Sequence, residues 1–124
     1  MAYSRKKSRE VVFRMLFAQS PIELACDGDE LPTGPELDYI NRLYNAAVEN
    51  LEEIDKIITE HSHGFSFDRI FKTDLTALRM GIAEMKYTDT QAVVVINEAV
   101  EIAKKYGTEK SGGFVNGILA KIKG

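Results

Sequence analysis

The sequence has little of the chemistry that marks secreted, metal-binding or membrane-spanning proteins. Its 124 residues include one cysteine, Cys26, so no intramolecular disulfide can form. The first ten residues are charged and lack the apolar core of a signal peptide, and no apolar run reaches the ~18 residues of a membrane span. We therefore expect a single cytoplasmic domain over residues 1–124, with no membrane association.

Catalytic and metal-binding motifs are also missing. The chain has no G-x-S-x-G, no glycine-rich phosphate loop after a strand, and no nucleophile beside an obvious base. His61 and His63 form an H-x-H pair, but no third ligand is near in sequence, and histidines suit the end of a helix for electrostatic reasons. We expect no enzyme activity, no metal site and no cofactor.

Positive charge is scarce in the middle of the chain and concentrated at its ends. The net charge is −3, yet residues 1–14 hold five basic residues against one glutamate, and so do residues 104–124. If the fold brings the two ends together, an acidic molecule acquires one basic face, which is typical of a partner with a phosphate backbone. The alternative is that the basic ends are only solvated segments.

Helical spacing of apolar residues accounts for most of the chain. It predicts a first helix from Ser4 to about Gln19, a long helix from Glu36 to about His61, and a helix capped by Thr73. All three prolines fall in residues 20–35, which we expect to be a loop, and the aromatic segment 65–71 is predicted to form about one turn over the core.

Two further helices complete an all-α fold of about six or seven helices. Residues 92–96 contain three valines and an isoleucine, which by propensity favour a strand. No second strand is available for pairing and the helical spacing continues, so we expect a helix from about Thr90 to Gly107. The last helix is predicted to begin at the N-cap Ser111. We expect these helices to share one core, which includes Leu78, Ile82, Ile96, Ala99 and Leu119.

Candidate RNA-binding residues come from both ends of the chain. On a helical wheel, Arg5, Lys6 and Arg9 lie within about 100° of one another, with Phe13 and Phe17 on the same side. Basic groups can hold phosphates while a ring stacks on an unpaired base. The alternative is that both phenylalanines belong to the core. We predict one RNA-binding face made of Arg5, Lys6, Lys7, Arg9, Phe13, Lys110 and Phe114.

Arg79 has two possible roles. It flanks the apolar stripe of the helix that Thr73 is expected to cap, where it could bind RNA or a partner. An arginine that ties two helices together by hydrogen bonds is the more common case.

The final two helices also carry a family resemblance. The segment INEAVEIAKKYGTEKS followed by FVNGIL resembles the signature of the NusB family of bacterial transcription antitermination factors. SRKKSREVVFRMLFAQ is similar to the arginine-rich first helix of that family, and TALRMGIAEM to its L-R-x-x-x-x-E-[LM] helix. The resemblance covers nearly the whole chain.

The resemblance implies a fold of two packed three-helix-type bundles and a role without catalysis. The implied partners are boxA-type RNA, the ribosomal small-subunit protein NusE and the RNA polymerase antitermination complex. For the protein partner we predict a surface that includes Phe17 and Asp74, separate from the RNA-binding face. This assignment rests partly on the resemblance and partly on the acidic middle of the chain.

Three positions depart from the family pattern. Gln91 stands where the family often has proline, Val93 where lysine is common, and Gly113 where a basic residue usually precedes F-V-N-G. Without that basic residue, either Lys110 and the N-terminal basic residues carry more of the RNA contact, or the affinity is lower.

Two other functions remain open from the sequence. The chain could be a protein-interaction module that binds no RNA directly, with the acidic middle as its surface. It also resembles the helical domain at the front of ribosomal-RNA cytosine methyltransferases, although the sequence has no catalytic domain after it.

Overall fold

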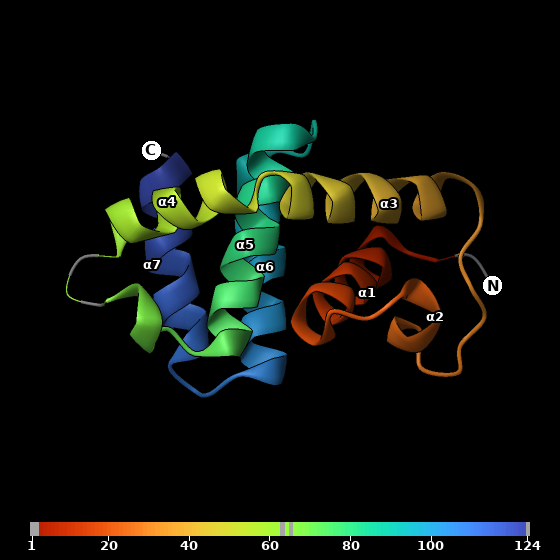
Figure 1. The fold of residues 1–124 in the computed structure, drawn as a ribbon, viewed down its shortest axis with the longest axis horizontal. Helices are drawn as coiled ribbons and strands as arrows, with labels where there is room; N and C mark the ends of the chain where they lie inside the picture. The colour runs from red at the N-terminus through yellow and green to blue at the C-terminus, as the bar shows by residue number, and fades with distance from the viewer. Residues whose placement is uncertain (1–2, 63, 65, 124) are drawn as a thin grey trace.

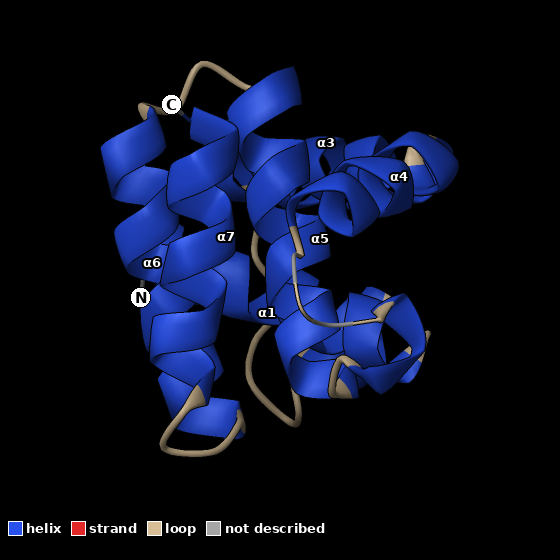
Figure 2. Ribbon diagram, turned by 90° about the vertical axis from the view of Figure 1, so that its left-hand side faces the viewer, coloured by secondary structure: helices blue, strands red, loops and turns tan. Residues whose placement is uncertain are grey.

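The computed structural model describes residues 3–62, 64 and 66–123. These residues form seven α-helices and one 3-10 turn (η1), with no strand among them, which confirms the predicted all-α class (Figure 2). The elements are α1 (Arg5–Ala18), α2 (Ile22–Ala25), α3 (Gly34–Glu49), α4 (Leu51–His61), η1 (Phe67–Arg69), α5 (Lys72–Tyr87), α6 (Ala92–Tyr106) and α7 (Ser111–Lys123).

Helix α5 is the centre of the fold. It packs against α1 and α3 on one side and against α4, α6 and α7 on the other. Figure 1 accordingly shows two groups of helices, α1–α3 and α4–α7, joined along α5. This arrangement agrees with the expected two bundles, and it places the start of α5 at the same end of the molecule as the loop from α6 to α7.

The predicted core residues are buried together. Leu78 and Ile82 of α5 and Leu119 of α7 have no exposed area, and Ile96 and Ala99 of α6 are 8% and 1% exposed. All five belong to one apolar cluster. The helical spacing therefore identified the correct inner faces of α5, α6 and α7.

The long predicted helix over residues 36–61 is wrong, because the chain bends at Asn50. The backbone of Asn50 leaves the helical region at φ −117° and ψ 23°, and its side-chain amide donates a hydrogen bond to the Ala46 carbonyl at 2.8 Å. Asparagine side chains compete with backbone hydrogen bonding in this way. The bend lets α3 pack on α1 and α5 while α4 reaches α5 and α7.

Several element boundaries also differ from the predictions. The proline-containing segment includes the short helix α2. Helix α5 starts at Lys72, with Phe71 in place of Thr73 as its N-cap residue. Ser111 is the first residue of α7, and its hydroxyl accepts a hydrogen bond from the Thr108 N–H at 2.8 Å. By contrast, the preference for a helix over a strand at 92–96 is confirmed by α6.

The aromatic segment before α5 is only partly a cover for the core. Residues 67–69 form the predicted single turn, and Ile70 is buried. Phe71 is 64% exposed, so the expectation that its ring covers the core is wrong. His63 and Phe65, which the sequence interpretation also used, lie outside the described residues.

Arg79 ties two helices together. Its Nε and Nη2 atoms donate to the two carboxylate oxygens of Asp55 at 2.8 and 2.9 Å, which joins α5 to α4. A bidentate pair of this kind fixes both the distance between the two helices and their orientation.

Within the described part of the chain, no helix is long and apolar enough to cross a membrane.

Candidate nucleic-acid interface

The first turns of α1 present three accessible cations. Ser4 caps the helix by accepting a hydrogen bond from the Lys7 N–H at 3.0 Å, which fixes where the basic segment begins. The side chains of Arg5, Lys6 and Lys7 are 42%, 63% and 47% exposed. These three predicted RNA-binding residues are therefore at the surface, as expected.

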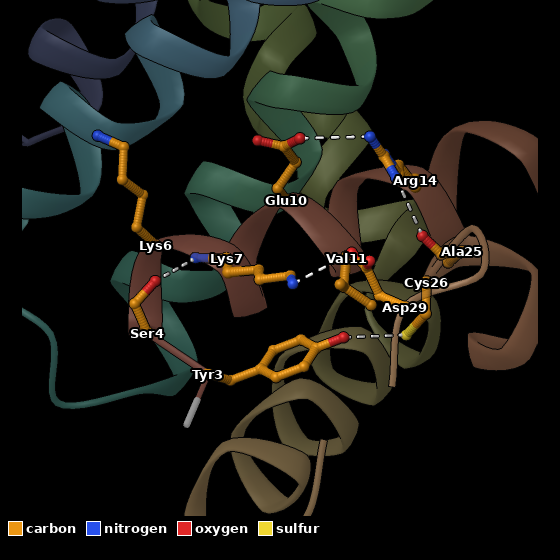
Figure 3. A pocket seen from close by; sticks show the side chains of 10 residues that line it. All are labelled: Tyr3, Ser4, Lys6, Lys7, Glu10, Val11, Arg14, Ala25, Cys26 and Asp29. Carbon is orange, nitrogen blue, oxygen red and sulfur yellow. Dashed lines mark hydrogen bonds and ion pairs between the residues drawn. The ribbon is translucent and has the colours of Figure 1, made fainter. Parts of the chain in front are cut away.

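Each of these cations meets a carboxylate from another part of the chain. The pairs are Arg5 with Glu36 at 3.0 Å, Lys6 with Glu101 at 2.6 Å, and Lys7 with Asp29 at 3.1 Å. Figure 3 shows Lys6 extending toward α6 while Lys7 extends toward Asp29. The hydrogen bond from Arg5 holds the pKa of Glu36 below its usual value.

Arg9 occupies a different environment from its neighbours. It is 5% exposed, and its Nε donates to the carboxylate of Glu84 at 2.8 and 3.0 Å. Glu84 is 1% exposed and also accepts a hydrogen bond from the Tyr39 hydroxyl. A guanidinium held in this way cannot reach a phosphate at the surface, so the structure does not support Arg9 as an RNA contact.

Phe13 is buried, although the helical wheel placed it on the basic side of the first helix. The side chain is 2% exposed and stacks against Phe17 and Tyr106, with ring centroids 5.9 and 4.9 Å away. The alternative interpretation, in which Phe13 is a core residue, is correct because the apolar face of α1 is wider than its valine and methionine positions suggest.

Charged and polar side chains of α1 and α6 contact one another where the two helices meet. We call this line of contacts the α1–α6 seam (Lys6, Glu10, Arg14, Lys105 and Tyr106). Glu10 accepts hydrogen bonds from Lys105 and from the Tyr106 hydroxyl, each at 2.7 Å. It also pairs with Arg14 at 3.4 Å, and Figure 3 shows this pair. Burial raises the pKa of Glu10, but these hydrogen bonds outweigh burial and leave its pKa below the usual value.

The sequence interpretation missed two members of this seam as site residues. Lys105 is 58% exposed and Arg14 is 36% exposed. Their signal was present in the charge excess at each end of the chain. For Lys105 this charge had another explanation, because the helix dipole favours a cation at the C-terminal end of α6.

Lys110 lies in the turn between α6 and α7, and Phe114 lies in the first turn of α7. Together with Asp74, Arg69 and Phe71 they line a pocket at the start of α5, which we call the α5 pocket. Asp74 was predicted to bind a protein partner on a separate surface. The structure instead brings it together with two predicted RNA-binding residues, so the expected separation of the two surfaces is wrong at this point.

Phe17 lies beside a neighbouring groove. The groove is formed by the end of α1, the loop around α2 and the start of α5, and its lining includes Phe17, Leu24 and Thr73. The Lys72 ammonium lies 4.5 Å from the centre of the Phe17 ring, and Leu24 is 70% exposed. This predicted partner-binding residue is therefore at an accessible and mostly apolar site.

No group of three or more potential metal ligands occurs among the described residues. The His61 Nδ1–H donates a hydrogen bond to the Ile57 carbonyl oxygen at 2.8 Å, within its own helix.

Comparisons with known proteins agree with the sequence resemblance. The NusB family profile matches residues 6–123. The transcription antitermination protein NusB of Agathobacter rectalis is 42% identical over 129 residues, covering 96% of this chain and 98% of that protein.

Two solved structures share the fold. A structure of T. maritima NusB superposes with a TM-score of 0.85 at 34% identity, covering 99% of this chain and 92% of that one. A crystal structure of antitermination factors NusB and NusE in complex with dsRNA also gives a TM-score of 0.85, at 30% identity, covering 96% of this chain and 95% of the matched one. The chain belongs to the NusB family.

Proposed function

We propose that the chain is a transcription antitermination factor that binds boxA-type single-stranded RNA together with the ribosomal small-subunit protein NusE. In this role it joins the RNA polymerase antitermination complex in the cytoplasm and supports transcription of ribosomal RNA. Two comparisons support the proposal: the relative named as an antitermination protein matches over nearly the whole chain, and a similar structure contains NusE and dsRNA.

The observation that carries the RNA-binding part of the proposal is accessible positive charge on α1 and α6. Arg5, Lys6, Lys7 and Lys105 meet carboxylates at 2.6–3.1 Å, yet each side chain is at least 42% exposed. Exposed ion pairs contribute little to stability, so phosphate oxygens can replace these carboxylates at little cost. Each replacement also releases counterions from the RNA, which favours binding at low salt.

The proposed path of the RNA follows the α1–α6 seam. Lys6 pairs with Glu101 and Lys105 pairs with Glu10, so the two helices run in the same direction and their cations alternate along the seam. From Lys6 to Arg14 the helix rises about 12 Å, at about 1.5 Å per residue. Lys110 extends the path beyond α6 toward the α5 pocket.

We further propose that NusE contacts the groove beside Phe17. The groove is largely apolar at Leu24 and Phe17, which suits an apolar side chain of a protein partner better than a phosphate. Asp74, the other residue predicted for the partner, lines the α5 pocket and is 5% exposed. Phe17→Ala is expected to weaken NusE binding and to leave binding of RNA alone nearly unchanged.

The experiment that tests the function is a titration of labelled boxA-like single-stranded RNA against the protein, with and without NusE. We expect binding to RNA alone and tighter binding when NusE is present. A matched control is Lys56→Gln, which removes an exposed cation of α4 and should change neither titration. Binding of NusE without any RNA binding would contradict the proposal and favour a protein-interaction module.

A further inference from the structure

One residue that lines the α5 pocket, Asp74, carries a buried hydrogen-bond acceptor. Asp74 lies in the first turn of α5 and is 5% exposed. Its Oδ1 atom is buried and has no hydrogen-bond partner in the part of the chain that the structure describes. Leaving a buried polar atom unpaired is costly, more so for a charged group. A ligand that donates hydrogen bonds would remove this cost.

The same pocket carries positive charge from two residues. Arg69 and Lys110 both line it, and both are exposed residues. A cationic side chain of a partner protein would be attracted by Asp74 but repelled by these two groups. The arrangement suits a ligand that donates hydrogen bonds at one end and carries negative charge at the other. A nucleotide has these two properties in its base and its phosphate.

Aromatic side chains supply the remaining contacts. Phe71 and Phe114 line the pocket, and Phe71 is 64% exposed although its side chain is large and apolar. Unpaired bases stack on rings of this kind, and each such contact strengthens binding without regard to sequence. The cavity has a volume of about 280 Å³, close to the lower end of the range for small-molecule sites.

The Asp74 carboxylate can accept hydrogen bonds from some bases better than from others. Guanine offers two adjacent donors on its Watson–Crick edge, the N1–H and the N2 amine. Adenine and cytosine place an unprotonated ring nitrogen beside their single amine, and uracil flanks its N3–H with two carbonyl oxygens. These acceptors would repel the carboxylate.

We propose that the α5 pocket binds an unpaired guanine of the RNA, with Asp74 accepting hydrogen bonds from its Watson–Crick edge. Phe71 and Phe114 contact the base, and Lys110 and Arg69 hold the adjoining phosphates. This inference rests on the proposed RNA-binding function and gives it a base preference at one position.

The test compares short oligouridine RNAs that carry guanine, inosine, adenine or cytosine at one central position. The protein should bind the guanine RNA about tenfold more tightly than the uridine parent, as expected for two directed hydrogen bonds to a base. Inosine lacks the N2 amine and should give an intermediate affinity. Asp74→Asn should remove the guanine preference, because its carboxamide presents a donor where the carboxylate presents an acceptor.

Two further variants serve as controls. Asp68→Asn neutralises an exposed carboxylate of η1 that does not line the pocket, and it should keep the guanine preference. Lys110→Gln should weaken binding of all the RNAs to the same extent, because a phosphate contact does not distinguish bases. Thermal unfolding of each variant identifies any loss of folded protein.

The outcomes separate this inference from the proposed function. If the unmodified protein binds none of the RNAs, the proposed function itself fails. If it binds all of them equally, or if Asp74→Asn keeps the guanine preference, the guanine pocket is wrong and RNA binding stands. Loss of NusE binding in Asp74→Asn with an unchanged base preference would likewise overturn it and assign Asp74 to the protein partner.

Discussion

Arg9 of α1 and Glu84 of α5 form a buried ion pair. The Arg9 Nε lies 2.8 and 3.0 Å from the Glu84 carboxylate oxygens, and the two side chains are 6% and 1% exposed. The pair joins α1 to α5 across 75 residues of sequence. The basic segment of α1 therefore has two functions: Arg9 holds the helix in place, and Arg5, Lys6 and Lys7 remain accessible.

Removing one member of this pair should destabilise the fold. Arg9→Met leaves the Glu84 carboxylate buried without its cation, and such a loss costs about 3–5 kcal/mol. Urea unfolding measures the change in the free energy of unfolding. The double variant Arg9→Met with Glu84→Gln should recover part of the loss, because no unpaired charge remains buried.

RNA affinity distinguishes this structural role from a direct contact. At a temperature where Arg9→Met is still folded, its affinity for RNA should equal that of the unmodified protein. An unchanged stability combined with a large loss of RNA affinity would show that Arg9 is a phosphate contact after all.

Truncating a side chain of the shared core should also lower the free energy of unfolding. Ile82 is fully buried at the centre of α5, and Ile82→Ala should lower the free energy of unfolding by about 2–5 kcal/mol. Val94 of α6 is 41% exposed and is a matched control, for which Val94→Ala should cost less than about 0.5 kcal/mol. Similar costs at both positions in a denaturant titration would mean that the assigned helix faces are incorrect.

Acid should weaken the attachment of α1 to α3. The hydrogen bond from Arg5 lowers the pKa of Glu36 from its usual 4.5, so the folded state binds this proton less readily than the unfolded chain. The resulting stability is present above pH 4.5 and is lost as the pH falls through the lower folded pKa. Glu36→Gln should therefore lose less stability than the unmodified protein between neutral and acid pH.

Chemical unfolding of both proteins at several pH values measures this difference. Glu60→Gln, at an exposed position of α4, provides the control and should follow the unmodified protein. Identical pH profiles for Glu36→Gln and the unmodified protein would show that the Arg5–Glu36 pair does not contribute to acid sensitivity.

Local sequence patterns predicted the inner faces of α5, α6 and α7 correctly. The spacing of Leu78, Ile82 and Leu119 depends only on helical geometry, and the structure buries all three. The helix at 92–96 was also predictable, although its valines favour a strand, because the apolar spacing continues to Ala99. These features follow from positions close together in the chain.

Features that depend on distant residues were not predictable in the same way. The burial of Arg9 requires Glu84 to lie opposite it, and nothing near Arg9 in sequence indicates this partner. The position of Phe13 depends on Tyr106, which stacks on it from α6. The bend at Asn50 has a local cause in the asparagine side chain, but the surrounding apolar spacing continues across it and hides the break.

The candidate site shows the same division. Exposed cations at Arg5, Lys6 and Lys7 were identified from charge and helical spacing alone. The meeting of Asp74 with Lys110 and Phe114 was not, because it depends on how the start of α5 packs against the turn between α6 and α7.

The salt dependence of RNA affinity tests the central claim, that the exposed cations of α1 bind the RNA backbone, most directly. The affinity of the unmodified protein for single-stranded RNA should fall steadily as salt rises. For a variant with both Arg5→Gln and Lys6→Gln, the slope of log affinity against log salt should be smaller by about 1.4, at about 0.7 per phosphate contact. Lys56→Gln should keep the original slope. Equal slopes and equal low-salt affinities for the double variant and the unmodified protein would contradict the claim.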